Sequence, residues 1–256
     1  MISINILSWN RPALLQLTIS SLIYSLKGSP LPLEIIILDQ GSDRETLAVL
    51  DKWESRVTKI IRLKENIGIA AGWNAMYKLS RGDYILPIEN DWFCDASSSA
   101  WLATAIRVLQ HDSKIAFVKL RHIVDYDNYG FGHIDHAPWT VKPDQKDLYE
   151  IRKINEDITY YCATSKNISF TFNPVLMPRS FRHHIGSSYT DDPGNLTPLR
   201  SGEDRPSDVW RNQTDYVGAT LIDGPFRHTG FHTRLPKIIA LPKYMLKLKI
   251  RENFNI

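Results

Sequence analysis

The 256-residue chain combines 43% hydrophobic with 23% charged residues, a composition typical of a globular protein that can bury a sizeable core. Its 31 basic and 28 acidic residues nearly balance, so the sequence lacks the concentrated basic charge of a nucleic-acid-binding protein, and we expect no nucleic-acid partner. The two cysteines, Cys94 and Cys162, lie far apart and belong to no C-x-x-C pair, which excludes a disulfide framework and a cysteine-based zinc site.

Short apolar segments alternate with helical patterns from the start of the chain. Residues 2–7 predict a strand, and Asn10 is expected to cap a helix whose first turn contains Pro12, where a missing N–H has no cost. Apolar residues recur along this helix at spacings of three and four, as a helix with one buried face requires: Leu15, Ile19, Leu22, Ile23 and Leu26.

The alternation continues through the next segments. Residues 33–38 are rich in isoleucine and predict a strand buried on both faces. A loop at 39–43 precedes a helix at 44–53 and a third strand at 59–63.

Four further segments extend the pattern to residue 120. We expect helices over 70–79 and 97–110, and strands over 83–88 and 115–120. Strands that alternate with helices predict βαβ units. The expected fold class is therefore α/β, a mostly parallel open sheet flanked by helices.

The pattern loosens from residue 121 onward, where we expect an irregular half of loops, short strands and short helices over the sheet of the first half. The tail at about 236–256 mixes lysines with apolar residues and predicts a basic amphipathic helix that either docks on the protein or touches an anionic membrane surface. No apolar run reaches the ~20 residues of a membrane span, and no secretory signal is recognisable. We expect a cytoplasmic protein, with the membrane surface as a possible location through the tail.

Polar residues follow the ends of three predicted strands. They are the loop from Ser8 to Arg11, the loop that begins with Asp39, and the turn Glu89-Asn90-Asp91. Ligands of an open parallel sheet bind beyond the carboxyl ends of its strands, so these loops are expected to line one crevice.

Each of these acids has two interpretations. Asp39 could accept a hydrogen bond from a nucleobase or a ribose, or it could form an Asx-turn before the next helix. The acids of the turn, Glu89 and Asp91, could hold Mg²⁺ or Mn²⁺, which prefer carboxylate oxygens, or they could be solvated. Gly68 and Gly72, at the start of a helix, would let the backbone approach a ligand closely.

The order and spacing of these features resemble the family-2 glycosyltransferases, which have the GT-A fold. The segments that show the resemblance are ISINILSWNRPALLQLTISSL, EIIILDQGSD and RLKENIGIAAGWNAMYKLSRGDYILPIENDW. It implies inverting transfer of a sugar from a nucleoside-diphosphate donor, with UDP-sugar favoured, to a hydroxyl of a glycan or similar acceptor. Residues 1–120 would bind the nucleotide sugar, and residues 121–256 would form the half of the same domain that binds the acceptor and holds the catalytic base.

The resemblance also assigns roles to single residues. Asp39 maps to the acid that contacts the nucleobase, and Asp91 maps to the acid that binds Mn²⁺ or Mg²⁺. The role of Glu89, where the family usually has Asp, stays open between a ribose contact, a water-mediated metal contact and none. His228 resembles a late histidine that some members use as a further metal ligand. The residues expected around the donor are Ser8, Asn10, Arg11, Asp39, Asn66, Gly68, Asn74, Glu89 and Asn90.

The segment SGEDRPSDVWRNQ resembles the Gly-Glu-Asp segment near the acceptor site of the family. The resemblance assigns the catalytic base to Asp204, with Glu203 as the rival, while the residues alone also fit acids at a helix start, where they complement the dipole. The Gln-x-x-Arg-Trp motif of processive synthases is absent from the sequence, so we expect one transfer per binding event.

Two other functions are considered. A sugar-nucleotide pyrophosphorylase would be expected to have a glycine-rich, basic phosphate loop near its N-terminus, and NRPALLQ is not one. A catalytically degenerate GT-A domain could serve as a carbohydrate-binding or scaffolding module. The acids at positions 39, 91, 203 and 204 argue against it, whereas the Glu at position 89 keeps it open.

Overall fold

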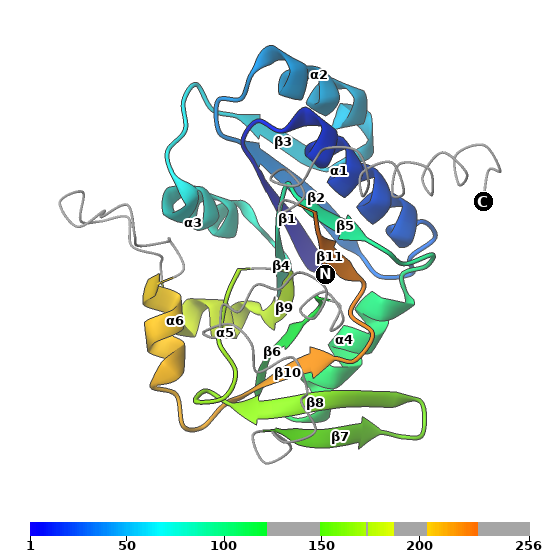
Figure 1. Ribbon diagram of the computed structural model, residues 1–256, viewed down its shortest axis with the longest axis vertical. Coiled ribbons are helices and arrows are strands. Elements are labelled where there is room, and N and C mark those ends of the chain that lie inside the picture. The colour runs from blue at the N-terminus through cyan, green and yellow to red at the C-terminus, as the bar shows by residue number, and fades with distance from the viewer. Residues whose placement is uncertain (122–148, 173, 187–203, 230–256) are drawn as a thin grey trace.

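The computed structural model describes residues 1–121, 149–172, 174–186 and 204–229, and Figure 1 shows how their elements are arranged. Within this part of the chain, one nine-stranded sheet has the order β3-β2-β1-β4-β9-β6-β10-β8-β7, and a two-stranded sheet pairs β11 with β5. The elements in chain order are β1 Ile2–Ser8, α1 Pro12–Leu26, β2 Leu33–Asp39, α2 Arg44–Trp53, the 3₁₀ turn η1 Glu54–Arg56, β3 Lys59–Arg62, α3 Ile69–Leu79, β4 Tyr84–Glu89, β5 Trp92–Cys94, α4 Ala100–His111, β6 Ile115–Lys119, β7 Glu150–Ile154, β8 Ile158–Thr164, β9 Val175–Pro178, α5 Arg179–His184, α6 Asp204–Arg211, β10 Val217–Leu221 and β11 Phe226–His228.

Four neighbouring parallel strands, β3, β2, β1 and β4, come from the first half of the chain, as predicted. β1 pairs in parallel with β2 on one side and with β4 on the other, and β2 pairs in parallel with β3. The register places Ser8 beside Asp39 and Leu7 beside Glu89, so the carboxyl ends of β1, β2 and β4 share one edge of the sheet. This register fixes where the loops of the predicted crevice begin.

The second half of the chain extends the same sheet. β9 lies between β4 and β6 and is antiparallel to both. β10 pairs in parallel with β6. β8 then pairs with β10, and β7 with β8, both in antiparallel fashion. The sequence predicted short strands here but gave no sign of β9 between two strands of the first half. Strand pairing of this kind depends on the partner strand rather than on the local residues.

Helices cover both faces of the sheet, and each face has its own core. On one face, alternate residues of β1 (Ile2, Ile4 and Ile6) pack with α1, α2 and α4, whereas the other face packs with α3, α5 and α6 (Figure 1). The predicted apolar stripe of α1 is confirmed, since Leu15, Ile19, Leu22 and Leu26 are buried and Ile23 packs against them.

The predicted helix cap at Asn10 is wrong. The residue before α1 is Arg11, whose backbone is left-handed and which makes no side-chain capping bond. Asn10 instead uses its side-chain oxygen to accept a hydrogen bond of 2.9 Å from the Asp43 amide. Its side chain therefore connects the loops after β1 and β2 and does not cap the N-terminus of α1.

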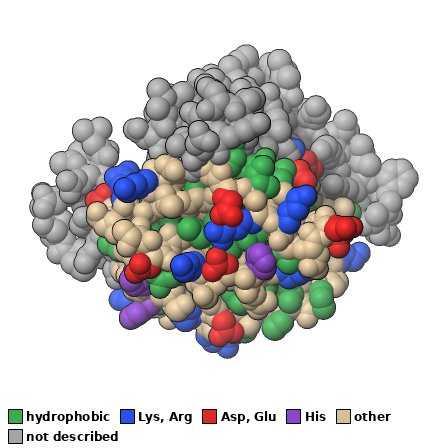
Figure 2. Space-filling view, turned by 90° about the horizontal axis from the view of Figure 1, so that it is seen from below, with side chains coloured by type: hydrophobic (Ala, Val, Ile, Leu, Met, Phe, Trp, Pro, Cys, Tyr) green, Lys and Arg blue, Asp and Glu red, His purple; other side chains and the backbone are tan. Residues whose placement is uncertain are grey.

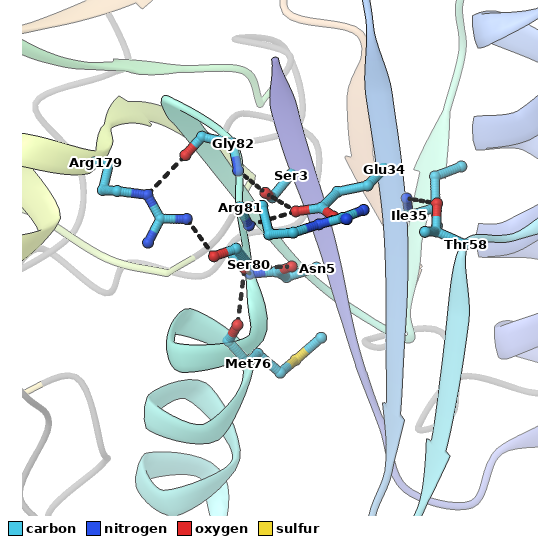
Figure 3. A network of polar contacts seen from close by, with 10 residues as sticks. All are labelled: Ser3, Asn5, Glu34, Ile35, Thr58, Met76, Ser80, Arg81, Gly82 and Arg179. Carbon is cyan, nitrogen blue, oxygen red and sulfur yellow. Dashed lines mark hydrogen bonds and ion pairs between the residues drawn. The ribbon is translucent and has the colours of Figure 1, made fainter.

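A buried polar network holds the amino ends of β1, β2 and β4 together (Figure 3). The carboxylate of Glu34 accepts hydrogen bonds from the Ser3 hydroxyl and from the backbone and side chain of Arg81, while the Gly82 amide donates to the Ser3 hydroxyl. Arg179 donates to the Gly82 carbonyl and so fixes the start of α5 to the same edge. This edge is opposite to the one where the carboxyl ends of the parallel strands meet.

On the face seen in Figure 2, acidic and basic side chains lie interspersed, without a continuous patch of one sign. In the described ranges, no helix combines the length and the apolar character needed to cross a bilayer. The tail at 236–256, for which the sequence predicts an amphipathic helix, lies outside the described residues.

Candidate active site

The acidic turn forms a rigid corner between two strands. β4 ends at Glu89 and β5 begins at Trp92, whose amide donates to the hydroxyl of Thr18 on α1. The backbone carbonyl of Asp91 accepts two hydrogen bonds from Thr229, at 2.8 Å from the amide and 2.7 Å from the hydroxyl. The backbone of Asp91 is thus held from the β11 side, just beyond the carboxyl end of β4.

The Asp91 carboxylate has two unequal oxygens. Its Oδ2 accepts a hydrogen bond of 2.8 Å from Arg11 Nη1, and His228 Nε2 lies 3.3 Å from the same oxygen. Its Oδ1 is buried and has no hydrogen-bond partner among the described residues. A buried carboxylate oxygen without a partner is unfavourable, because its hydration has been lost and not replaced.

Asp91 and His228 fit a divalent cation. Carboxylate oxygens are the preferred ligands of Mn²⁺ and Mg²⁺, and neighbouring ligands around an octahedral Mg²⁺ lie about 3 Å apart, close to the 3.3 Å between Asp91 Oδ2 and His228 Nε2. The described residues contain no group of three or more His, Cys, Asp or Glu that could hold a metal. Water and the phosphates of a bound nucleotide commonly occupy the other positions around Mg²⁺.

The loop after β1 is fastened to its neighbours by its backbone and by Asn10. The Asn90 side-chain amide donates to the Trp9 and Asn10 carbonyls at 3.3 and 2.9 Å, and the Asn10 amide donates to the Ser42 hydroxyl at 2.8 Å. The structure therefore brings together the three loops that the sequence placed in one crevice. The side-chain NH₂ group of Asn90 thus donates to the protein's own backbone.

Asp39 makes local hydrogen bonds in the loop before α2, but to the third residue after it rather than to the second, as an Asx-turn would require. Its carboxylate accepts from both the amide and the hydroxyl of Ser42, and the side chain is fully buried. Gly41 follows with φ +67°, and a Cβ there would come within 2.8 Å of the Glu65 backbone. The loop after β2 is therefore packed tightly against the loop before α3. Each carboxylate oxygen can still accept a further hydrogen bond.

The other residues expected around the donor differ in burial and in their hydrogen-bond partners. Ser8 is buried, and its hydroxyl has no partner among the described residues. Asn66 is exposed and accepts from the amide of Gly68, which has φ +85° and precedes α3. Asn74, further along α3, accepts a hydrogen bond of 3.3 Å from Arg182, a buried arginine whose pKa is lowered to about 10 by desolvation. The contact with Arg182 points Asn74 toward α5.

Sequence reasoning gave no role to Trp9, which is the most exposed tryptophan among the described residues. Its side chain is 51% exposed, directly after Ser8 and beside the Asp39 turn, and Ile67 and Ile69 near the start of α3 are also exposed. A large aromatic residue immediately after a buried strand was the signal that could have identified it. A flat exposed ring at this edge can stack on a planar ligand.

The predicted catalytic base lies at the start of α6. Asp204 is its first residue, and Glu203 lies outside the described residues. Two bonds anchor the helix: Ser207 donates to the Phe170 carbonyl, and Trp210 Nε1 donates to the Ile168 carbonyl. Two successive turns of α6 are thus bonded to the segment 168–170, and this contact fixes the orientation of the helix.

The comparison with protein families shows to which family the chain belongs. Residues 3–173, more than half of the chain, match the family model of glycosyl transferase family 2. The chain belongs to this family. The resemblance found in the sequence is thereby confirmed.

Individual proteins are also similar to the chain. The chain is 25% identical over 126 residues to the hyaluronan synthase of Pasteurella multocida. Among solved structures, TarS 1–349 of S. aureus aligns with 96% of the chain at 16% identity and a TM-score of 0.59. The mannosyltransferase PcManGT of Pyrobaculum calidifontis, solved with GDP-Man and Mn²⁺, aligns with 74% at 17% identity and a TM-score of 0.51.

These alignments confirm the predicted fold class, an α/β GT-A fold with flanking helices. The chain spans less than two thirds of each of these proteins: 12% of the synthase, 62% of the TarS chain and 48% of the mannosyltransferase chain.

Proposed function

We propose that the chain is an inverting, metal-dependent glycosyltransferase that moves a sugar from a nucleoside-diphosphate donor to a hydroxyl of a glycan or similar acceptor. The observation that supports this best is the nearly buried Asp91 carboxylate, with one oxygen unpartnered among the described residues and His228 beside the other, at the carboxyl edge of a family-2 sheet. The structural neighbour that holds GDP-Man and Mn²⁺ supports the donor type and the metal. UDP-sugar is the favoured donor, and GDP-sugar is the first alternative.

The donor would lie across the ends of β1, β2 and β4. Asp39 and Ser8, both fully buried, would lie at the floor, and the exposed Trp9 ring would supply a stacking face for the base. Stacking of a base on an aromatic side chain contributes ~1–3 kcal/mol in nucleic-acid complexes. The space beside Gly68, at the start of α3, is open, because a Cβ built there would meet no atom within 4 Å. The ligand could approach the backbone at this point.

Asp91 and His228 would hold Mn²⁺ or Mg²⁺ against the donor diphosphate. The cation would neutralise the charge that collects on the departing nucleoside diphosphate. Arg11, which already lies 2.8 Å from Asp91, adds positive charge at the same place. Glu89 ends β4 at the first position of this corner, and its role stays open between a ribose contact, a water-mediated metal contact and none.

Asp204 would act as the base. Its carboxylate takes the proton of the acceptor hydroxyl while the acceptor oxygen forms a bond to the anomeric carbon and the bond from that carbon to the diphosphate oxygen breaks, which inverts the configuration. General-base catalysis of this kind is typically worth ~10²–10⁴-fold in rate. On this proposal residues 1–120 bind the donor, and residues 121–256 bind the acceptor and supply the base.

A thermal-shift panel tests the donor and the metal together. UDP, GDP, dTDP and CDP are compared with and without Mn²⁺ on the wild type and on Asp91→Asn. A ligand at about 100 times its dissociation constant adds ~2.7 kcal/mol to stability, which such a scan detects. We expect one nucleotide to stabilise the wild type only with Mn²⁺, and the variant to lose this effect.

Donor turnover then separates an enzyme from a degenerate binding module. Metal-dependent hydrolysis of the matching nucleotide sugar by the wild type is expected, with Asp204→Asn binding the nucleotide normally but turning over ~10²–10⁴-fold more slowly. Binding without any hydrolysis or transfer would favour the binding module. Normal turnover by Asp204→Asn would move the base to another residue, with Glu203 tested next.

A further inference from the structure

The two partners of the ion pair between Arg11 and Asp91 differ in their exposure to solvent. The Arg11 side chain is 51% exposed, whereas the side chains of Asp91 and His228 are 8% and 15% exposed. The acid is fixed through its backbone by Thr229, while the guanidinium reaches it from the solvent side. If the pair separates, Arg11 is therefore the partner that moves.

The backbone at Arg11 is built to place its side chain. Asn10 and Arg11 have φ values of 53° and 59°, two consecutive left-handed residues without glycine. Non-glycine residues keep this conformation only where the surroundings hold them, and they gather at functional sites. Here the hydrogen bonds of Asn10 with Ser42, Asp43 and Asn90 hold the loop, and Arg11 is carried against the acidic turn.

The guanidinium and a metal ion would compete for one oxygen. Arg11 Nη1 donates to Asp91 Oδ2, and this is the oxygen that lies nearest to His228 Nε2. A cation that is held between Asp91 and His228 would need the position and the charge partner that Arg11 uses. Two positive groups at one carboxylate repel each other, so a metal on Asp91 would weaken the bond to Arg11 and Arg11 would weaken metal binding.

We propose that Arg11 is the resident counter-cation of Asp91, that a divalent metal displaces it, and that the released guanidinium then binds the donor diphosphate. The inference rests on the metal-dependent function proposed above. Arginine suits the second role because its fork of N–H donors matches two phosphate oxygens. The exchange would make metal affinity low before the donor arrives and high in its presence, since the diphosphate supplies Arg11 with a new partner.

Arg11→Gln gives this exchange a distinctive signature. Glutamine removes the charge and keeps a hydrogen-bond donor, so metal binding no longer competes with a guanidinium. We expect Mn²⁺ to bind Arg11→Gln about two- to fivefold more tightly than the wild type in the absence of nucleotide, the size of an ion pair whose cation is half exposed. In saturating Mn²⁺ the same variant should bind the donor nucleoside diphosphate at least about fivefold more weakly, because a charged hydrogen bond to phosphate is lost.

The measurements use the full chain. Free Mn²⁺ is titrated by its electron paramagnetic resonance signal, and UDP and GDP are titrated by calorimetry in saturating Mn²⁺. Arg11→Lys keeps the charge and should stay close to the wild type in metal affinity. Arg107→Gln, which removes a positive charge from the exposed side of α4, is the matched control and should change neither affinity. Thermal melts confirm that each variant is folded.

The outcomes separate this inference from the proposed function. If Asp91→Asn abolishes Mn²⁺ binding while Arg11→Gln leaves it unchanged or weakens it, the exchange is wrong and the metal site stands. If Asp91→Asn binds Mn²⁺ as the wild type does, the metal site itself is wrong, and the exchange is wrong with it. Tighter metal binding with unchanged nucleotide affinity would overturn the second step, the transfer of Arg11 to the diphosphate.

Discussion

Replacing Glu34 with glutamine should destabilise the fold without touching the candidate site. Glu34 lies on β2, and its side chain is 3% exposed. One carboxylate oxygen accepts from the Ser3 hydroxyl and the Arg81 amide, and the other accepts from Arg81 Nε at 2.9 Å. The substitution keeps the shape and removes the charge, and it places an NH₂ group opposite Arg81 Nε.

The expected loss is about 2 kcal/mol in the free energy of unfolding. Hydrogen bonds to a charged acceptor contribute ~1.5–3 kcal/mol, and those to a neutral one ~0.5–1.5 kcal/mol, so the bonds from Ser3 and from the Arg81 amide each lose about 1 kcal/mol. The third bond adds little, because the Arg81 side chain is 69% exposed and can turn toward water.

The loss should depend on pH. Burial acts to raise the pKa of Glu34, but the hydrogen bonds from Ser3 and from the backbone and side chain of Arg81 outweigh it and hold the pKa below its ordinary value of 4.5. A carboxylate whose pKa is lowered by folding stabilises the protein fully above the unfolded pKa, and this stabilisation is lost as the pH falls through the folded pKa. The wild type and Glu34→Gln should therefore differ most near pH 7 and converge in acid, below pH 4.5.

Urea unfolding at a series of pH values measures the difference. The matched control is Glu54→Gln, since Glu54 is also ion-paired with an arginine but its side chain is 61% exposed. We expect the control to lose no more than ~0.5 kcal/mol. Equal losses in the two variants, or a difference for Glu34→Gln that stays constant into acid, would refute the assignment of stability to this buried network.

Three substitutions test the site itself. Trp9→Ala should leave stability within ~0.5 kcal/mol, since the ring is exposed, and weaken nucleotide binding by ~1–3 kcal/mol in calorimetry; unchanged affinity would exclude stacking. Gly41→Ala should destabilise by at least ~1 kcal/mol and lower nucleotide affinity, because φ is +67° and the new Cβ would meet the Glu65 backbone; a neutral result in both measurements would contradict the tight packing. Trp210→Phe removes the bond to the Ile168 carbonyl and should lower kcat while sparing the KM for the donor, whereas a change in KM alone would argue against α6 as the support of the base.

The local pattern of the first half was enough to predict its elements. The helix expected at 44–53 is α2, and Asp43 caps it by accepting from the Thr46 amide. The strands expected at 33–38 and 83–88 are β2 and β4 to within a residue at each end. Such segments are readable because helical spacing, capping residues and buried strand runs are properties of neighbouring residues. The common edge for the loops after β1, β2 and β4 also followed from the sequence, since parallel strands joined by helices must end together.

Other features became visible only in the folded chain. β5 has three residues and no periodicity of its own, and it exists because it pairs with β11, more than a hundred residues later. The same pairing brings His228 to Asp91, while the left-handed backbone at Arg11 brings a guanidinium there from the other side. The sequence named these three residues one by one, but it could not show that they meet at one carboxylate oxygen. Ion pairs and short-strand pairing take their energy from long-range geometry, and that geometry is fixed only when the whole sheet has formed.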